Sequence, residues 1–130
     1  MENSEYGYRK KVEFPFSQAV ERTEEVLQSK GFGLLMKIDV QQKMKEKLGK
    51  EMEPYMILGA CHPPSAFETL QAEKEIGLLL PCNVIVYEKQ GDVFVSAFVP
   101  EVAMGFIQNS KLPPITAKVG AMLRFVIDAI

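Results

Sequence analysis

The strongest constraint on the fold of this chain is a repeated order of segments: an extended segment, a helix, and a second extended segment. Residues 33–40 and 77–84 are identical at four of eight positions, and each follows a strand-like and then a helix-like stretch. Two strand–helix–strand halves in one short chain are typical of the ferredoxin-like, split βαβ sheet. We therefore predict an α+β fold with a mostly antiparallel sheet of about five strands and with C-terminal helices.

Hydrophobic periodicity and turn residues locate the individual elements. Apolar or alternating stretches predict strands over residues 6–14, 33–40, 55–61, 82–88 and 93–98. Helical spacing predicts helices over residues 17–29, 40–48, 65–74, 101–109 and 115–130. We expect Gly31 to end its helix in the left-handed conformation, Gly49 to close the next helix, Ser65 to cap its helix, and Phe67 and Leu70 to face inward from it.

Length and charge limit the classes of protein. A chain of 130 residues matches one domain, residues 1–130. Its net charge of −2, with both signs interleaved, argues against a nucleic-acid partner. No stretch reaches the roughly 18–20 apolar residues that a membrane span needs, and the acidic N-terminus does not read as a signal peptide. We therefore expect a cytoplasmic protein without a nucleic-acid or membrane partner.

The last helix predicts a partner subunit. Residues 115–130 are apolar on almost every side, and one small domain can cover only one side of a helix. We therefore expect a homodimer.

Both cysteines and the single histidine occur in two short stretches, Cys61-His62-Pro63-Pro64-Ser65 and Pro81-Cys82-Asn83. In the split βαβ arrangement the first and third strands are parallel neighbours, with the fourth strand on the other side of the first. The two stretches, together with residues 14–17, would then meet at one end of the sheet. With one strand between them, Cys61 and Cys82 would be roughly 10 Å apart, too far for a disulfide.

The chemistry of these residues leaves several roles open. Cys61 ends a strand just before a helix, where free N–H groups and the helix dipole favour an anion and would lower the pKa of a thiol. Cys61, Cys82, Asn83 and Ser65 are therefore candidate contacts for a small ligand, including an anionic one. Cys61, His62 and Cys82 are three candidate ligands for a zinc-type metal, which normally takes four. Packing of both cysteines in the core is the structural alternative.

The chain also resembles a known family. Residues 55–63, with Ala66 and Leu70, and then residues 76–87 with their Leu-Leu-Pro-Cys-Asn element, resemble the core pattern of the domain of unknown function family 302. Gly31-Phe32, Ile38-Asp39-Val40 and Lys47-Leu48-Gly49 match its N-terminal half. The resemblance implies a small α+β domain that tends to form homodimers, with no established activity. The family often has Asn where His62 stands, which weakens a metal site built on this residue.

Three functional hypotheses follow. The first is a dimeric module that binds a small ligand at the strand-to-helix edge near Cys61 and Cys82. The second is a thiol-based redox or zinc-type metal protein that uses Cys61, His62 and Cys82. The third is a purely structural dimer. The chain has no glycine-rich phosphate loop and no Gly-x-Ser-x-Gly element, so no catalytic residue and no definite cofactor is assigned.

Overall fold

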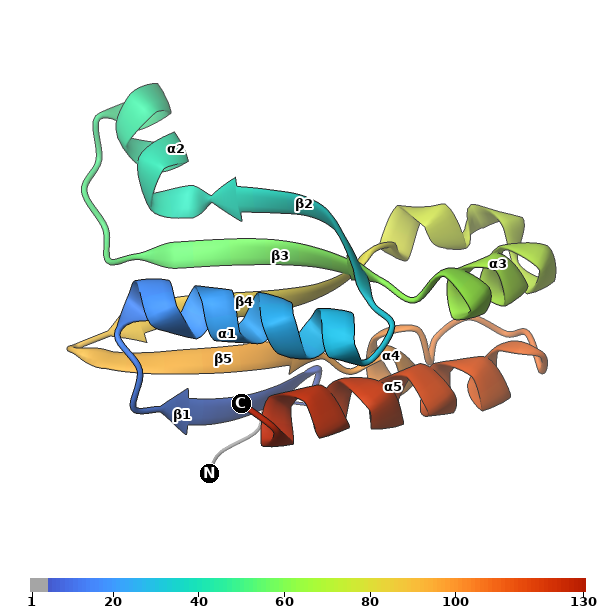
Figure 1. Cartoon of the computed structure of the whole chain (residues 1–130). Helices are drawn as coiled ribbons and strands as arrows, with labels where there is room; N and C mark the ends of the chain where they lie inside the picture. The colour runs from blue at the N-terminus through green and yellow to red at the C-terminus, as the bar shows by residue number, and fades with distance from the viewer. Residues whose placement is uncertain (1–4) are drawn as a thin grey trace.

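The computed structural model describes residues 5–130 and confirms an α+β fold with a five-stranded antiparallel sheet (Figure 1). The strands are β1 (Gly7–Val12), β2 (Gly33–Asp39), β3 (Tyr55–Cys61), β4 (Cys82–Lys89) and β5 (Asp92–Phe98). The helices are α1 (Phe16–Ser29), α2 (Val40–Leu48), α3 (Pro63–Ala72), α4 (Pro100–Ala103) and α5 (Leu112–Asp128), with a 3-10 helix η1 (Lys74–Leu79).

The order of the strands differs from the split βαβ arrangement. The sheet runs β1-β5-β4-β3-β2, and every neighbouring pair is antiparallel. β1 is an edge strand that pairs only with β5, so it is neither between β3 and β4 nor parallel to β3. Residues 14–17, which follow β1, therefore lie at the opposite end of the sheet from Cys61.

The internal repeat does not mark two equivalent halves. Residues 33–39 form strand β2, whereas Gly77, Leu78 and Leu79 belong to η1 and β4 begins only at Cys82. The shared residues reflect a common leucine-rich composition. Similar local sequence adopted different structures because the two segments have different tertiary neighbours.

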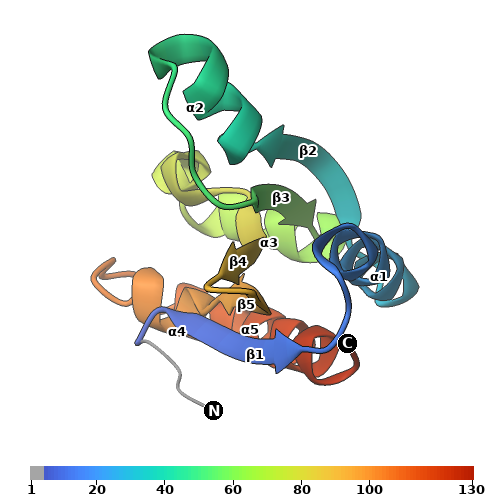
Figure 2. The same cartoon turned by 90° about the vertical axis from the view of Figure 1, so that its left-hand side faces the viewer.

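One face of the sheet is covered by α1 and α5, which lie on the same side of it (Figures 1 and 2). The side chains of β4 and β5 alternate, so that Val84, Val86, Val93 and Val95 are buried under these helices while the residues between them are partly exposed. Each fully buried valine contributes about 1.5–3 kcal/mol. Within residues 5–130, no helix equivalent to α1 or α5 covers the opposite face of the sheet.

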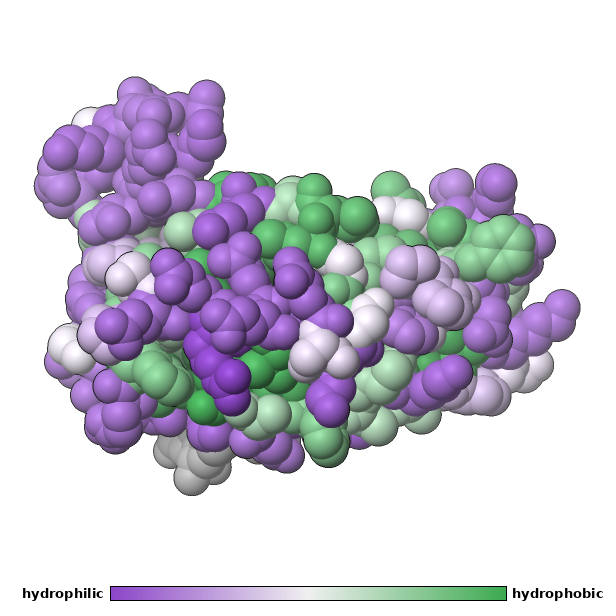
Figure 3. All heavy atoms as spheres, in the orientation of Figure 1, coloured by the Kyte–Doolittle hydropathy of each residue, from purple (hydrophilic) through white to green (hydrophobic). Residues whose placement is uncertain are grey.

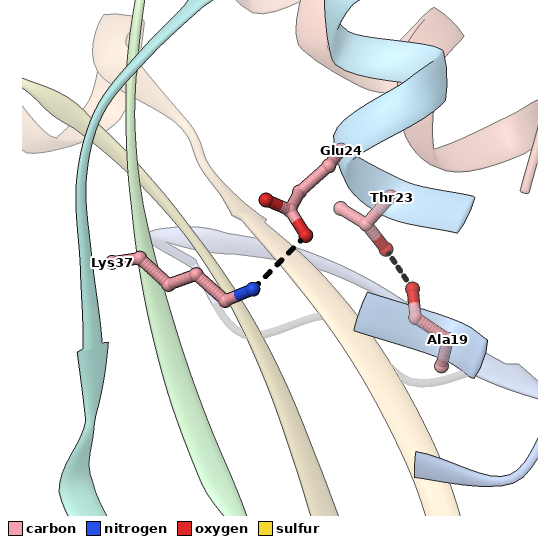
Figure 4. A network of polar contacts seen from close by, with 4 residues as sticks. All are labelled: Ala19, Thr23, Glu24 and Lys37. Atoms are coloured by element: carbon pink, nitrogen blue, oxygen red, sulfur yellow. Dashed lines mark hydrogen bonds and ion pairs between the residues drawn. The ribbon is translucent and has the colours of Figure 1, made fainter. Parts of the chain in front are cut away.

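α1 crosses from β1 at one edge of the sheet to β2 at the other edge. Its buried residues recur at helical spacing: Ala19, Val20, Thr23, Val26 and Leu27. The buried Thr23 hydroxyl donates a hydrogen bond of 2.7 Å to the carbonyl of Ala19, so burial leaves it no unpaired donor (Figure 4). Glu24 pairs with Lys37 of β2 at 3.2 Å and ties the helix to the edge strand.

α2 stands apart from the sheet, at the upper left of Figure 1, and none of its residues is buried. Local chemistry defines its ends: the Asp39 carboxylate accepts a hydrogen bond from the Gln42 N–H at 3.0 Å, and Gly49 closes the helix at a φ of 63°. The apolar side of this helix is only partly covered, because Val40 and Met44 are half-buried and Leu48 is exposed.

α5 is less exposed than its composition indicates. One side is buried against the sheet and α1, including Val119, Leu123, Val126 and Ile127. The Lys30 ammonium lies 4.1 Å from the ring centre of Phe125, the large apolar residue that α5 leaves exposed. The packing within one chain therefore accounts for most of the apolar surface from which a homodimer was predicted, and the dimer itself stays a prediction.

Among residues 5–130, no helix combines the length and the apolar character that a membrane crossing requires.

The turn after α1 generates a testable prediction. Gly31 has a φ of 84°, and the following Phe32 N–H donates back to the Leu27 carbonyl at 3.0 Å. Gly31→Ala should lower the free energy of unfolding by about 1–2 kcal/mol, because an L side chain is strained in this conformation. Urea unfolding followed by circular dichroism measures the loss.

Gly77→Ala is the matched control for this substitution. Gly77 has no positive φ, and a Cβ there would meet no atom within 4 Å. We expect this variant to keep the wild-type stability. Equal stabilities of the two variants would contradict the role given to Gly31.

Candidate functional site

A cavity of about 210 Å³ lies at the end of the sheet where β3 stops and β4 starts. α3 and α5 form its walls, and residues of α4 and of the segment before β4 complete it. Its lining is mainly apolar: Phe32, Leu35, Ala60, Cys61, His62, Ser65, Ala66, Thr69, Leu70, Leu80, Pro81, Cys82, Pro100, Met104, Ile115, Thr116 and Val119. The cavity exists because α3 lies beyond the end of the sheet rather than against its face (Figure 1).

Both cysteines line this cavity, and the pairing of β3 with β4 brings them together. Ala60 is the direct antiparallel partner of Cys82, so Cys61 is one residue beyond that pair. No strand lies between the cysteines, and the separation of roughly 10 Å expected from the split βαβ arrangement is therefore wrong. Both are free thiols, Cys61 partly exposed and Cys82 buried.

Burial makes both thiols less acidic than an ordinary cysteine. It raises the pKa of the Cys61 thiol, opposite to the lowered pKa expected at a helix start. It also raises the pKa of Cys82 to about 11, and the nearby Cys61 adds to that rise. At neutral pH both groups are therefore protonated. A protonated thiol is a poor nucleophile and a poor metal ligand.

Proline explains why the helix start does not favour an anion. α3 begins with Pro63 and Pro64, and α5 has proline within its first turn. Proline has no N–H, so these helix starts lack donors that would otherwise face the cavity. None of the described residues that line the cavity is Lys, Arg, Asp or Glu. The cavity therefore has no fixed charge to bind an anionic group.

The side chains of His62 and Ser65 are hydrogen-bonded to each other. The Nδ1 atom of His62 and the hydroxyl of Ser65 share a hydrogen bond of 2.7 Å. The histidine ring also packs near Phe32, with the ring centres 5.7 Å apart. Ser65 does not cap α3, as was expected, because the helix starts two residues earlier and His62 holds the capping position. Ser65 instead lies buried in the first turn.

The candidate metal ligands do not form a metal site. Within residues 5–130, no group of three His, Cys, Asp or Glu side chains is arranged to hold a metal ion. Cys61, His62 and Cys82 line the same cavity, but the imidazole is turned toward Ser65 and the Gly31-Phe32 turn.

Asn83 is the one candidate ligand contact that the structure separates from the others. It follows Cys82 directly in β4, and successive strand residues point to opposite faces of a sheet. Its side chain is exposed on the face away from α1 and α5, where it borders a different hollow.

Other cavity residues were missed by sequence reasoning. The Thr69 hydroxyl donates to the Ser65 carbonyl at 2.7 Å, and the Thr116 hydroxyl donates to the Pro113 carbonyl at 3.3 Å. These internal bonds leave the cavity apolar in spite of its hydroxyl groups. No local pattern marks Thr116, because only the docking of α5 brings it to the cavity.

Comparisons with known proteins agree with the fold. Residues 8–130 match the family described as domain of unknown function DUF302. A crystal structure of an uncharacterized conserved DUF302 protein from Bacillus stearothermophilus is similar to this chain, with a TM-score of 0.90 and 29% sequence identity. The similarity covers 96% of this chain and 98% of that one. A comparison with curated proteins found no match.

The buried Cys82 thiol predicts a specific pH dependence. Its pKa rises from 9.0 to about 11 on folding, so the folded state binds the proton more tightly than the unfolded state does. The resulting stabilisation is complete below pH 9 and disappears as the pH rises through about 11. Two pKa units correspond to roughly 2–3 kcal/mol.

Urea unfolding of the wild type and Cys82→Ala at pH 8 and above pH 11 tests this linkage. The wild type should lose roughly 2–3 kcal/mol more than the variant, because both share all other titrating groups. Equal losses in the two proteins would show that the Cys82 thiol is not protected by burial.

Proposed function

The chain belongs to the family of the domain of unknown function DUF302, and we propose that it binds a small, uncharged and mainly apolar molecule in the cavity between α3, α5 and the β3–β4 end of the sheet. The observation that carries this proposal is the cavity itself, whose three hydroxyl groups are hydrogen-bonded within the chain and whose lining contains no Lys, Arg, Asp or Glu. The sequence suggested an anionic ligand, but the cavity lining has no cationic side chain to bind one.

The size of the cavity supports a ligand with about one ring. An apolar cavity of about 150 Å³ in another protein stays dry and binds benzene. The present cavity has about 210 Å³, enough for one substituted ring or a short branched chain. Burying such a molecule is favourable at roughly 25 cal/mol per Å² of apolar surface, without any ion pair.

Exposed apolar side chains border the cavity and support an entrance on the side of β2 and α3. Leu35 is 65% exposed and Leu70 is 36% exposed, although both line the cavity. Phe67 points outward from α3 at 65% exposure, so the expectation that it faces inward is wrong, whereas Leu70 is partly exposed and lines the cavity. Figure 3 shows apolar atoms over β2 and α3, where an apolar ligand could pass from the surface inward.

No observation favours the redox or zinc hypothesis over ligand binding. Cys61 and Cys82 contribute weakly polar, polarisable walls to the cavity in their protonated form. A sulfur atom beside an aromatic ring is a favourable contact, which makes an aromatic ligand suitable. The homodimer and the cytoplasmic location stay predictions from the sequence.

Toluene is a suitable probe of the cavity. We expect toluene to raise the thermal unfolding midpoint saturably and to shift the amide resonances of Ala66 and Thr116 in ¹⁵N NMR spectra. Ala66→Leu should abolish both effects, because the added carbon atoms occupy part of the cavity. Circular dichroism checks that the variant is folded.

Ala117→Leu is the matched control, since Ala117 is exposed on α5 and does not line the cavity. It should bind toluene as the wild type does. The proposal fails if toluene has no saturable effect on the wild type, or if Ala66→Leu binds it with unchanged affinity.

A further inference from the structure

Leu35 lines the apolar cavity although most of its side chain is exposed. It belongs to β2, an edge strand of the sheet, and edge strands commonly carry charged side chains at their exposed positions. Leu70 of α3 also lines the cavity and is partly exposed. The two leucine side chains form the mouth of the cavity, where its apolar lining reaches the surface.

An irregularity in the pairing of β2 with β3 accounts for the position of Leu35. Leu34 is opposite Ala60 of β3. The preceding residue of β3, Gly59, is opposite Met36, so β2 contributes one extra residue, Leu35. Such a β-bulge changes the direction of side chains locally and is common beside functional sites. Leu34 packs against the core and the Met36 side chain lies over Gly59. Leu35 does neither, and its side chain lines the cavity.

The apolar surface at the mouth extends beyond what a ligand inside the cavity would cover. The cavity of about 210 Å³ accommodates about one ring, and a ligand of that size would leave Leu35 and Leu70 in contact with water. None of the described residues of the lining is Lys, Arg, Asp or Glu, so an apolar chain meets no charged group between the interior and the mouth. A ligand that also covers the mouth buries more apolar surface, which favours binding.

We propose that the ligand of this cavity carries an unbranched alkyl chain that leaves through the mouth. A ring or a branched group fills the interior, the chain lies across Leu35 and Leu70, and an uncharged polar end remains in water. Leucine has no hydrogen-bonding group in its side chain, so the mouth holds the chain by van der Waals packing alone. This ligand class rests on the binding function proposed for the cavity, and it narrows that function to elongated molecules.

Two phenylalkanols of different length test the proposal by isothermal titration calorimetry. 2-Phenylethanol and 6-phenyl-1-hexanol share the ring and the hydroxyl group, and the second has a longer alkyl chain. Each CH₂ group that covers the mouth should tighten binding roughly two- to fourfold, so 6-phenyl-1-hexanol should bind the wild type roughly tenfold or more tightly than the shorter probe. In ¹⁵N NMR spectra both probes should shift the amide resonances of Ala66 and Thr116, and only the longer probe should also shift those of Leu35 and Leu70.

Two leucines with almost the same exposure give a matched comparison. Leu35 is 65% exposed at the mouth, whereas Leu48 is 66% exposed on α2 and is not a cavity residue. Leu35→Ser should weaken binding of 6-phenyl-1-hexanol roughly fivefold or more and leave that of 2-phenylethanol within about twofold, because only the longer probe reaches the mouth. Leu48→Ser should leave both affinities unchanged. Leu70→Ser should reproduce the selective effect of Leu35→Ser, and circular dichroism checks that the variants are folded.

The outcomes separate this ligand class from the binding function itself. If neither toluene nor 2-phenylethanol binds the wild type saturably, both proposals fail. If these compact probes bind and the longer phenylalkanol binds no more tightly, only the alkyl chain is excluded. Equal effects of Leu35→Ser and Leu48→Ser on the longer probe overturn it as well. So does a mouth covered by a second copy of the chain, which sedimentation would show as a dimer that Leu35→Ser dissociates.

Discussion

The covering of one face of the sheet by α1 and α5 is the constraint on which the rest of the structure depends. These helices bury the alternate valines of β4 and β5 and so form the larger of two hydrophobic core clusters in the described residues. Because strand side chains alternate, the same register directs Arg9, Tyr87 and Asn83 to the uncovered face. The sheet therefore separates the apolar cavity at its end from the residues of its other face. Cys82 and Asn83 illustrate the separation, since neighbours in sequence border different hollows.

The chemical character of the interior cavity results from how the surrounding helices begin. Proline in the first turns of α3 and α5 removes backbone donors that would otherwise attract an anion or a thiolate. The hydroxyl groups of Ser65, Thr69 and Thr116 are engaged within the chain, so they add little polarity. Burial in this apolar environment raises the pKa of both thiols, so they stay protonated at neutral pH. A pair of thiols near a histidine thus becomes part of an apolar wall.

Local features were predictable, and non-local features were not. The strand limits, the hairpin between β4 and β5, the left-handed Gly31 and the helix end at Gly49 follow from short-range sterics, which depend on a few neighbouring residues. The strand order was wrong because a repeated local pattern carries no information about which strands pair. Cys61 and Cys82 were expected at one end of the sheet, and they lie there through direct pairing of β3 with β4. Thr116 could not be predicted as a cavity residue, since α5 reaches the cavity only by tertiary docking.

The sequence by itself determined the α+β class, the approximate positions of the elements and the resemblance to the DUF302 family. Periodicity and turn residues act over a few positions, and short family elements can be recognised without coordinates. Only the tertiary structure decided the order of the strands, the raised pKa values of both thiols, the turning of His62 toward Ser65 and the exposure of Asn83 on the other face. The strand order and the pKa values depend on contacts and burial that involve residues far apart in the sequence. The orientations of His62 and Asn83 depend on how their segments pack in the folded chain. The linear sequence specifies neither of these directly.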